Sequence, residues 1–220
     1  MELELVFVVP VPLETEILIE GAVVKYKPEY LRMEEADIIF EKLKKMEKYA
    51  LNETGVMYGK PWTSDRKSLQ IGDPGVRRYS YAGASATEVF PFQKFRVVER
   101  LRRRILEDTG VYYNFALVNF YPTSADLGYH SDRETDQEEG APIASLSFGD
   151  ARHLKFRLKE TPRLTVKDFY LESGSLLTME GDCQKVMEHS LLKAAKNDII
   201  IFDKRVNITL RVMKMAKPKK

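Results

Sequence analysis

The sequence predicts a single α+β domain in which two helices precede a set of β-strands that form a sandwich or jelly roll. Two stretches, residues 33–49 and 92–108, carry apolar residues at helical spacing. After Gly110 the pattern changes to short runs rich in β-branched and aromatic residues, which is typical of strands. Helices and strands that are segregated along the chain favour the α+β class. A length of 220 residues fits one domain, residues 1–220.

The N-terminal part is predicted to form an extension followed by a helix, over residues 1–50. Prolines and a glycine interrupt residues 1–30, which favours short strands and turns. The helix that follows should bury one apolar face, formed by Ala36, Ile39, Phe40, Leu43 and Met46.

Residues 51–90 mix Gly, Pro and Asp with aromatic and basic residues, and we expect exposed loops and hairpins there. The second helix should bury a stripe of Phe95, Val98, Leu101 and Ile105. Its outer face is predicted to be basic, with Lys94, Arg96, Arg100, Arg102, Arg103 and Arg104. Such a face could meet phosphates or could simply be solvated.

Residues 111–215 are predicted to form the β-core. The expected strands are residues 115–121, 142–148, 153–158, 169–171, 175–179, 198–202 and 206–213. In the third of these, Leu154, Phe156 and Leu158 alternate with polar residues, as in a half-buried strand.

The net charge and the cysteine content place few limits on the binding partners and the location of the protein. The net charge is only +2, so it does not identify a binding partner. Cys183 is the sole cysteine, which rules out an internal disulfide and favours an intracellular location. The apolar run near the N-terminus is too short to span a bilayer, so we expect no membrane partner. We also expect a monomer.

Two histidines and an aspartate suggest a metal site. His130 and Asp132 are two residues apart, so on an extended segment their side chains point the same way. His189 would arrive from a later strand. Two imidazoles and one carboxylate are the ligands of a non-haem Fe(II) centre with open coordination positions. The alternative is that these are unrelated polar residues, because His-x-Asp alone is common.

A strand with two arginines follows the second histidine. Arg205, Asn207, Thr209 and Arg211 alternate with apolar residues and therefore share one face. Arginines that face an interior require anions. A bound dicarboxylate and Asp132 would supply them; the alternative is a solvated face on an edge strand. Asn119 and Tyr121 likewise share a face and could bind the same acid, or lie on the wet side of an ordinary strand.

Taken together, these residues resemble the AlkB family of Fe(II)- and 2-oxoglutarate-dependent dioxygenases. The resemblance rests on an ordered set: Asn119-x-Tyr121, His130-x-Asp132, His189 and Arg205-x-Asn207-x-Thr209-x-Arg211. It covers about residues 55 to 215 and implies a double-stranded β-helix (jelly roll) core. Residues 58–60, 66–67, 72–75 and 79–83 are similar to the nucleotide-recognition lid of the duplex-DNA repair branch, which places the lid at residues 51–90.

The resemblance implies a role for each site residue. His130, Asp132 and His189 would bind Fe(II), and with Arg211 they would form the catalytic group. Arg205 would pair with the distal carboxylate of 2-oxoglutarate, and Asn119, Tyr121, Asn207 and Arg211 would complete its pocket. The implied substrate-binding residues are Tyr58 as an aromatic finger, Tyr79 and Tyr81 against an extruded base, and Glu134 at its exocyclic amine. Lys60 and Arg66 are added as substrate-binding residues because their charges could meet phosphates.

The implied activity is oxidative demethylation of 1-methyladenine and 3-methylcytosine in DNA. Fe(II), 2-oxoglutarate and O2 would be consumed in hydroxylating the N-methyl group, with release of formaldehyde, succinate and CO2. Such an enzyme would be nuclear in a eukaryote and cytoplasmic otherwise. Residues 191–198 are less basic than the corresponding loop of the duplex-repair branch, which leaves duplex and single-stranded DNA both open. RNA demethylation by the same chemistry and a non-catalytic, metal-containing nucleic-acid-binding module are the alternatives.

Overall fold

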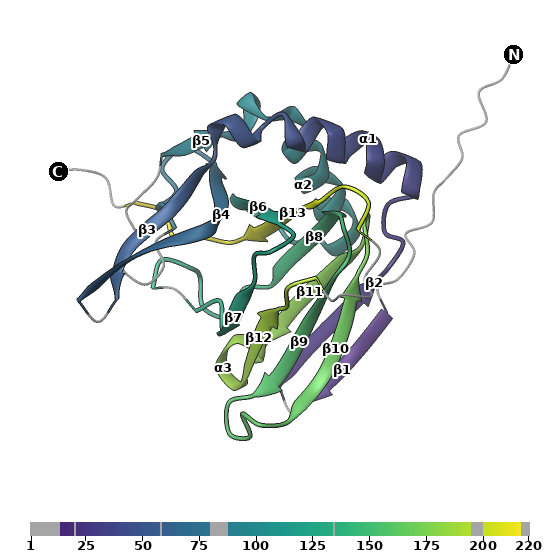
Figure 1. The fold of residues 1–220 in the computed structure, drawn as a ribbon, viewed down its shortest axis with the longest axis vertical. Helices are drawn as coiled ribbons and strands as arrows, with labels where there is room; N and C mark the ends of the chain where they lie inside the picture. Colours follow the sequence, from purple (N-terminus) through teal and green to yellow (C-terminus); the bar gives the residue numbers. More distant parts are fainter. Residues whose placement is uncertain are drawn as a thin grey trace, which may run out of the picture.

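Two β-sheets face each other in the computed structural model, which describes residues 14–19, 21–57, 59–79, 88–133, 135–194 and 200–216 (Figure 1). The major sheet contains nine strands and the minor sheet four. The major sheet consists of β1 (Glu14–Ile19), β2 (Ala22–Lys27), β3 (Leu51–Met57), β4 (Lys60–Gly72), β5 (Val89–Pro91), β6 (Phe115–Pro122), β8 (Ile143–Gly149), β11 (Leu176–Gly181) and β13 (Lys204–Arg211). The minor sheet consists of β7 (Leu127–His130), β9 (Arg152–Leu158), β10 (Thr165–Leu171) and β12 (Met187–Leu191).

The chain passes repeatedly between the two sheets from β6 to β13. Strands β6, β8, β11 and β13 belong to the major sheet, while β7, β9, β10 and β12 belong to the minor sheet. Within the major sheet β13 lies between β6 and β8, antiparallel to both. This two-sheet winding is a double-stranded β-helix, so the predicted jelly roll is confirmed.

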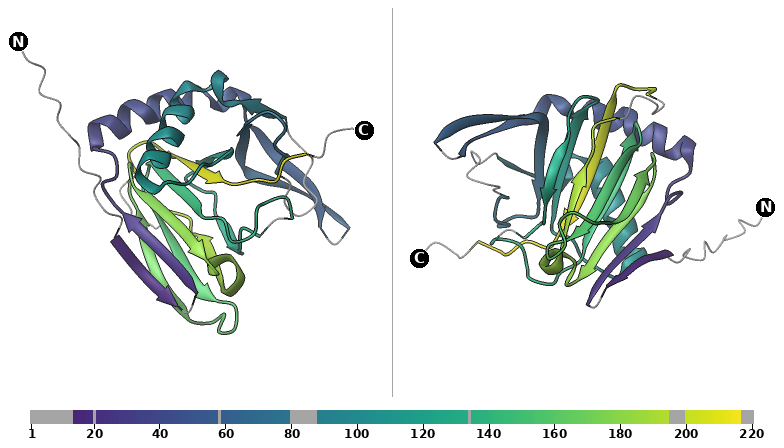
Figure 2. Two further views of the ribbon diagram at one scale, coloured as in Figure 1. Left: turned by 180° about the vertical axis from the view of Figure 1, so that it is seen from behind. Right: turned by 60° about the horizontal axis from the view of Figure 1, so that its bottom comes forward.

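The helical layer covers the outer face of the major sheet (Figure 2). It contains α1 (Met33–Lys44) and α2 (Arg96–Thr109), with short 3₁₀ turns η1 (Glu47–Tyr49) and η2 (Phe92–Lys94) beside them. Phe40 of α1 and Ile105 of α2 share one apolar core with Ile208 of β13. Gly110 ends α2 with φ 72°, a left-handed conformation that glycine adopts without strain. Both predicted helices are therefore present, with η1 and η2 in place of a continuous helix at one end of each.

Strands β1 and β2 pair antiparallel and extend the major sheet at one edge. Strand β2 pairs with β11 along its whole length, from Ala22 to Lys27. The predicted short strands are confirmed there, while residues 1–13 lie outside the described residues.

Two sequence predictions are corrected by the packing. Arg102 is not on the solvated face of α2; it is buried, its guanidinium lies 3.9 Å from the Phe92 ring, and it forms ion pairs with Asp73 and Glu99. The second correction concerns the strand expected at residues 198–202. Residues 201–203 form bends instead, because Asp150 accepts the backbone N–H groups of Ile201 and Phe202 that a strand would use for pairing. Residues 195–199 lie outside the described residues.

Hairpin β3–β4 occupies much of the region expected to be exposed loops and hairpins. Its outer part is exposed and projects from the sheet (Figure 1). The inner half of β4 pairs with β6 from Lys67 to Gly72 and is mostly buried. Part of the proposed lid is therefore a core strand of the major sheet.

Candidate active site

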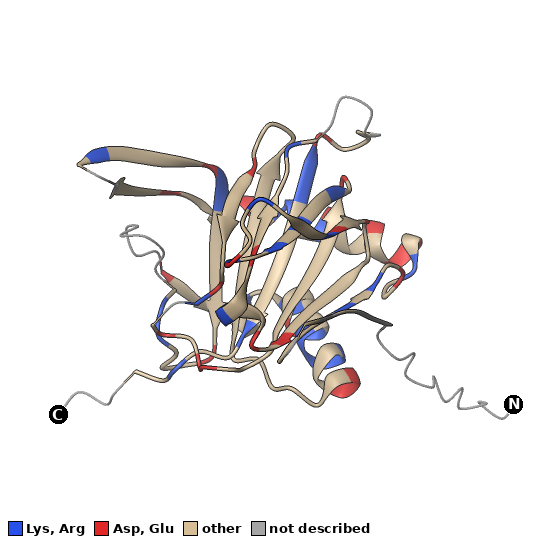
Figure 3. Ribbon diagram, turned by 90° about the horizontal axis from the view of Figure 1, so that it is seen from below, with Lys and Arg blue, Asp and Glu red and all other residues tan. Residues whose placement is uncertain are grey.

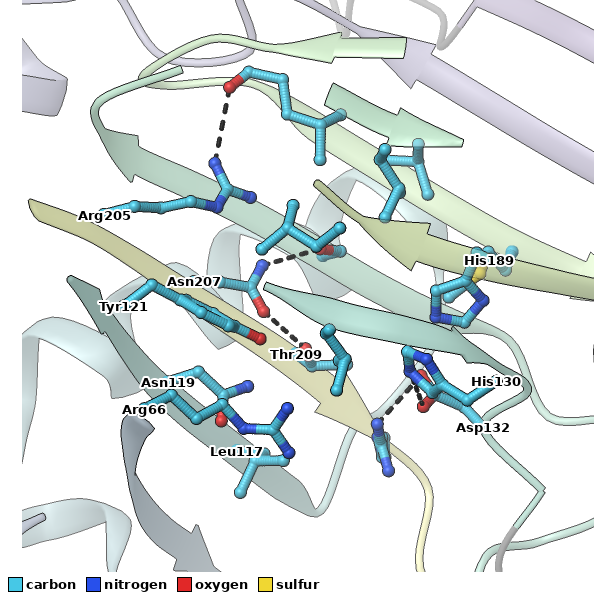
Figure 4. A pocket seen from close by; sticks show the side chains of 18 of the residues that line it. Arg66, Leu117, Asn119, Tyr121, His130, Asp132, His189, Arg205, Asn207 and Thr209 are labelled. Atoms are coloured by element: carbon cyan, nitrogen blue, oxygen red, sulfur yellow. Dashed lines mark hydrogen bonds and ion pairs between the residues drawn. The ribbon is translucent and has the colours of Figure 1, made fainter. Parts of the chain in front are cut away.

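A cavity of about 700 Å³, including its open mouth, lies between the two sheets. Inward-facing side chains of β4, β6, β13 and β12 line it (Figure 4). One row of β13 side chains crosses the cavity. His130, Asp132 and His189 lie together at one end of that row, and Arg205 lies at the other (Figure 4).

The three predicted metal ligands meet because β7 and β12 are neighbours. His130 and His189 are directly opposite each other in this antiparallel pair, and their ring centroids are 4.3 Å apart. Asp132 follows β7, and its Oδ1 lies 3.6 Å from His130 Nε2. One ligand atom from each of the three side chains lies within 4.8 Å of the others, so the group could hold one metal ion.

Neighbouring groups orient these ligands. His130 Nδ1 lies 2.8 Å from the carbonyl oxygen of Gly128, so Nδ1–H donates and Nε2 is left for a metal. The backbone N–H of Asp132 donates to Gln184 Oε1 at 2.8 Å. Arg211 Nη2 lies 2.9 Å from Asp132 Oδ2. The site is thus supported by hydrogen bonds on two of its three ligands.

The local electrostatics favour the protonation states that bind metals. Burial raises the pKa of Asp132, but Arg211 and the two histidines outweigh it and lower the pKa to about 2. Burial and the neighbouring His130 lower the pKa of His189 to about 3. Asp132 is therefore a carboxylate and His189 a neutral imidazole at neutral pH, as metal coordination requires.

Strand β13 buries both of its faces. Val206, Ile208 and Leu210 pack under the helical layer, whereas Arg205, Asn207, Thr209 and Arg211 line the cavity. The alternative of a solvated edge strand is excluded, since β13 is central and Arg205 and Arg211 are buried.

Arg205 is a buried cation at the far end of the cavity. Its Nη2 donates to Ser147 Oγ at 2.8 Å and its Nη1 to the carbonyl oxygen of Leu171 at 3.4 Å, while Nε has no hydrogen-bond partner. Among the residues that the structure describes, no carboxylate forms an ion pair with it. Burial lowers its pKa to about 10, which leaves it charged at neutral pH. A buried guanidinium in this setting fits a bound anion.

The predicted partners on β6 lie beside this arginine. Tyr121 is directly opposite Arg205 and Asn119 is directly opposite Asn207 in the β6–β13 pair. Both β6 side chains are buried, which excludes the alternative of a wet strand face. Ser68 Oγ donates to Asn119 Oδ1 at 2.9 Å, so β4 helps to hold the pocket together.

The residues predicted to bind substrate occupy different settings. Tyr79 is buried; Gln70 hydrogen-bonds its backbone N–H and C=O, and the Arg211 guanidinium lies 4.4 Å from its ring. Arg66 is also buried and lines the cavity, so it is not an exposed phosphate contact. Lys60 is exposed on hairpin β3–β4. Tyr58, Tyr81 and Glu134 lie outside the described residues.

Several supporting residues were missed from the sequence. Ser145 and Ser147 alternate along β8 and bond to Asn207 and Arg205. Their spacing of two residues was a usable signal, since it places both side chains on the same face of the strand. Gln184, which accepts the backbone N–H of Asp132, gave no such signal.

Together, the double-stranded β-helix and a His-Asp-His group facing a buried arginine define a class of protein: a metal-dependent oxygenase that uses an acidic co-substrate. The model of the 2OG-Fe(II) oxygenase superfamily matches residues 23–211. The chain belongs to this superfamily, and its relatives belong to the AlkB family within it.

Two relatives illustrate the similarity. The chain is 37% identical over 187 residues to the mouse protein named DNA oxidative demethylase ALKBH2, covering 80% of this chain and 74% of that protein. It is 34% identical over 125 residues to human alpha-ketoglutarate-dependent dioxygenase alkB homolog 3, covering 53% of this chain and 42% of that protein. The solved structure described as "The structure of OsALKBH1" matches with a TM-score of 0.57 at 19% identity, covering 89% of this chain and all of that one, which supports the fold.

The protein is an Fe(II)- and 2-oxoglutarate-dependent dioxygenase, and O2 is its third reactant. The residues present fit these groups, because two imidazoles and a carboxylate suit Fe(II) and the buried Arg205 can pair with an acid. Among the helices that the structure describes, none has the length and apolar character needed to cross a bilayer.

Proposed function

We propose that this protein demethylates alkylated nucleobases in DNA, with 1-methyladenine and 3-methylcytosine as its substrates. The observation that carries the proposal is one cavity with three features: a His-Asp-His group, the buried Arg205 and a wall formed by Tyr79. The mouse and human relatives named DNA oxidative demethylase ALKBH2 support DNA as the substrate class.

We assign His130, Asp132 and His189 to iron, and Arg205 to the distal carboxylate of 2-oxoglutarate. The remaining pocket residues for the co-substrate are Asn119, Tyr121, Asn207 and Arg211. Once bound, Fe(II), 2-oxoglutarate and O2 supply the oxidising power that hydroxylates the N-methyl group, with release of formaldehyde, succinate and CO2.

The chain's own residues bind and orient the reactants. Arg211 connects the metal-binding group with the wall of the cavity that we assign to the base, because it pairs with Asp132 and lies against the ring of Tyr79. Tyr79 lines the cavity, and we assign it to the wall beside an extruded base. The assignments of Tyr81 to the other side of the base, Glu134 to its exocyclic amine and Tyr58 to the gap left in the helix rest on the family resemblance.

Lys60 is our candidate for a phosphate contact, because it is exposed on a hairpin whose inner end reaches the cavity. A methyl group at N1 of adenine or N3 of cytosine blocks base pairing, so such bases are extruded at lower cost. We further propose that residues 1–220 act as one monomeric oxygenase domain inside the cell, in the nucleus of a eukaryote or the cytoplasm otherwise.

A mass assay on short DNA with one 1-methyladenine tests the proposal, as duplex and as single strand. Protein with Fe(II), O2 and 2-oxoglutarate should remove one methyl mass, and reactions without 2-oxoglutarate should not. The ratio of the two rates gives the strand preference. If 2-oxoglutarate is consumed while both DNAs keep the methyl group, DNA is the wrong substrate, and the same lesion in RNA becomes the next probe.

A further inference from the structure

A bulge in hairpin β3–β4 brings one acidic and one basic side chain together beside the cavity. Asn52 pairs with Lys67 and Thr54 pairs with Thr63, so Glu53 of β3 faces three residues of β4, Ser64 to Arg66. The side-chain amide of Asn52 donates to the carbonyl oxygens of Ser64 and Arg66. Bulges next to active sites redirect side chains. Here the bulge allows Glu53 and Arg66 to face each other.

Glu53 and Arg66 form a buried ion pair. Arg66 Nη2 donates to Glu53 Oε2 at 3.1 Å, and the Arg66 and Glu53 side chains are 9% and 6% exposed, respectively. Burial lowers the pKa of Arg66, but Tyr121 and Glu53 outweigh it, so the guanidinium remains charged. Removing either partner would leave the other as an uncompensated buried charge.

Arg66 also faces the reaction site. Its guanidinium carbon lies 5.9 Å from the ring centroid of Tyr121, and its side chain lines the cavity together with Tyr79 and Asp132 (Figure 4). The cavity contains two further arginines. Arg211 is paired with Asp132, and Arg205 lies at the end assigned to 2-oxoglutarate. Arg66 is the third arginine of the cavity, and Glu53 is the carboxylate that neutralises it.

This balance matters for the charge of the base. Methylation at N3 of cytosine or N1 of adenine gives a ring that is positively charged at neutral pH. Methylation at N3 of thymine gives a neutral ring of similar size. A bare guanidinium in a cavity of low dielectric constant would repel the first kind of base and not the second.

We propose that Glu53 is a specificity-determining residue, which neutralises Arg66 and thereby lets the cavity accept a cationic methylated base. The inference rests on the proposed function and adds a selection by substrate charge. Glu53 does not touch the reacting atoms; it acts through Arg66.

The experiment compares DNA single strands with one 3-methylcytosine or one 3-methylthymine, and measures kcat/KM for each. Glu53→Gln should lower the ratio of cationic to neutral substrate by about tenfold, the change expected for one unbalanced charge at this range. Arg66→Gln should not lower this ratio. The double variant, with no charge at either position, should restore the ratio of the parent protein.

Glu35→Gln is the matched control, because Glu35 pairs with Arg104 at 3.1 Å in the helical layer, remote from the cavity. It should leave the ratio unchanged. An equal loss on both substrates in Glu53→Gln would show a merely structural role and overturn the proposal. If Glu53→Gln does not fold, the double variant decides: a ratio at least as high as the parent's supports the proposal, and a ratio lower by about tenfold overturns it.

Failure of the proposed function gives a different result. In that case the parent protein demethylates neither DNA. Failure of the inference alone leaves the parent active and the substrate ratio unmoved by Glu53→Gln.

Discussion

At the scale of single residues, the cavity is organised by how its buried charges are balanced. Arg211 is paired with Asp132 and Arg66 with Glu53. For Arg205, by contrast, the described part of the chain provides a serine hydroxyl and a carbonyl oxygen but no carboxylate. Because a buried charge is costly unless it is paired, this difference marks Arg205 as the residue that meets an external acid.

Replacing Arg205 with alanine should raise the KM for 2-oxoglutarate by about 10- to 100-fold, which corresponds to the loss of one hydrogen bond to a charged group. Iron affinity should be unaffected, since Arg205 lies at the opposite end of the cavity from the histidines. Steady-state kinetics at varied 2-oxoglutarate measure the first effect, and metal titration measures the second. An unchanged KM would contradict the assignment.

Asp132→Ala should abolish both iron binding and turnover, because it removes the only carboxylate of the three-residue group. It also leaves Arg211 without its partner, so Asp132→Asn, which preserves size and hydrogen bonding, is the companion variant. Metal content and 2-oxoglutarate turnover should fall in both variants. Retained activity in either one would remove Asp132 from the metal site.

At the scale of elements, one arginine forms hydrogen bonds with segments next to β7 and β12, the two strands that carry the histidines. Arg152 of β9 is buried and donates to the carbonyl oxygens of Pro122, Thr123 and Ala125, in the turn that leads to β7. It also donates to Leu192, just after β12. The spacing of β7 and β12, and hence of His130 and His189, depends on these bonds.

Arg152→Met should therefore lower the free energy of unfolding by about 3 kcal/mol, since several buried carbonyl groups lose a charged donor. Chemical denaturation of the metal-free protein measures this loss. Iron affinity should fall as well, because the ligands are held less firmly. Arg100→Met is the control, since Arg100 is an exposed arginine of α2. Equal free energies of unfolding for the two variants would show that the hydrogen bonds of Arg152 do not stabilise the fold.

Elements with a regular period were predictable, and contacts between distant segments were not. The alternation from Arg205 to Arg211 predicted a shared face, and the metal ligands followed from residue type and spacing. The spacing of Ser145 and Ser147 indicates a shared face, but the contact of Ser147 with Arg205 depends on which strands become neighbours. The contact of Gln184 with Asp132 joins segments 52 residues apart, which no local pattern specifies. The bulge at Glu53 depends on a shift in strand register, which the sequence does not reveal.

At the scale of the whole molecule, the helical layer and the cavity lie on opposite faces of the major sheet. Leu69, Val118 and Ile208 pack toward the helices, while Asn119 and Asn207 on the same sheet face the cavity. Lys and Arg are spread over the molecule rather than gathered on one face (Figure 3). In the ranges that the structure describes, no strongly basic face therefore indicates where DNA would lie. Instead, the position of each lysine or arginine relative to the cavity decides whether it can reach a DNA strand whose base occupies the cavity.

This arrangement leads to a prediction about DNA affinity. Lys60 is exposed on the hairpin whose inner end lines the cavity, whereas Arg100 is exposed on the helical layer. Lys60→Ala should weaken DNA binding and reduce the steepness of its salt dependence by about 1 in a plot of log K against log salt, the loss of one phosphate contact. Arg100→Ala should change neither quantity. Fluorescence anisotropy at several salt concentrations measures both. A salt slope that falls for Arg100→Ala and not for Lys60→Ala would mean that DNA crosses the helical layer instead, which would require the strand to bend around the edge of the major sheet.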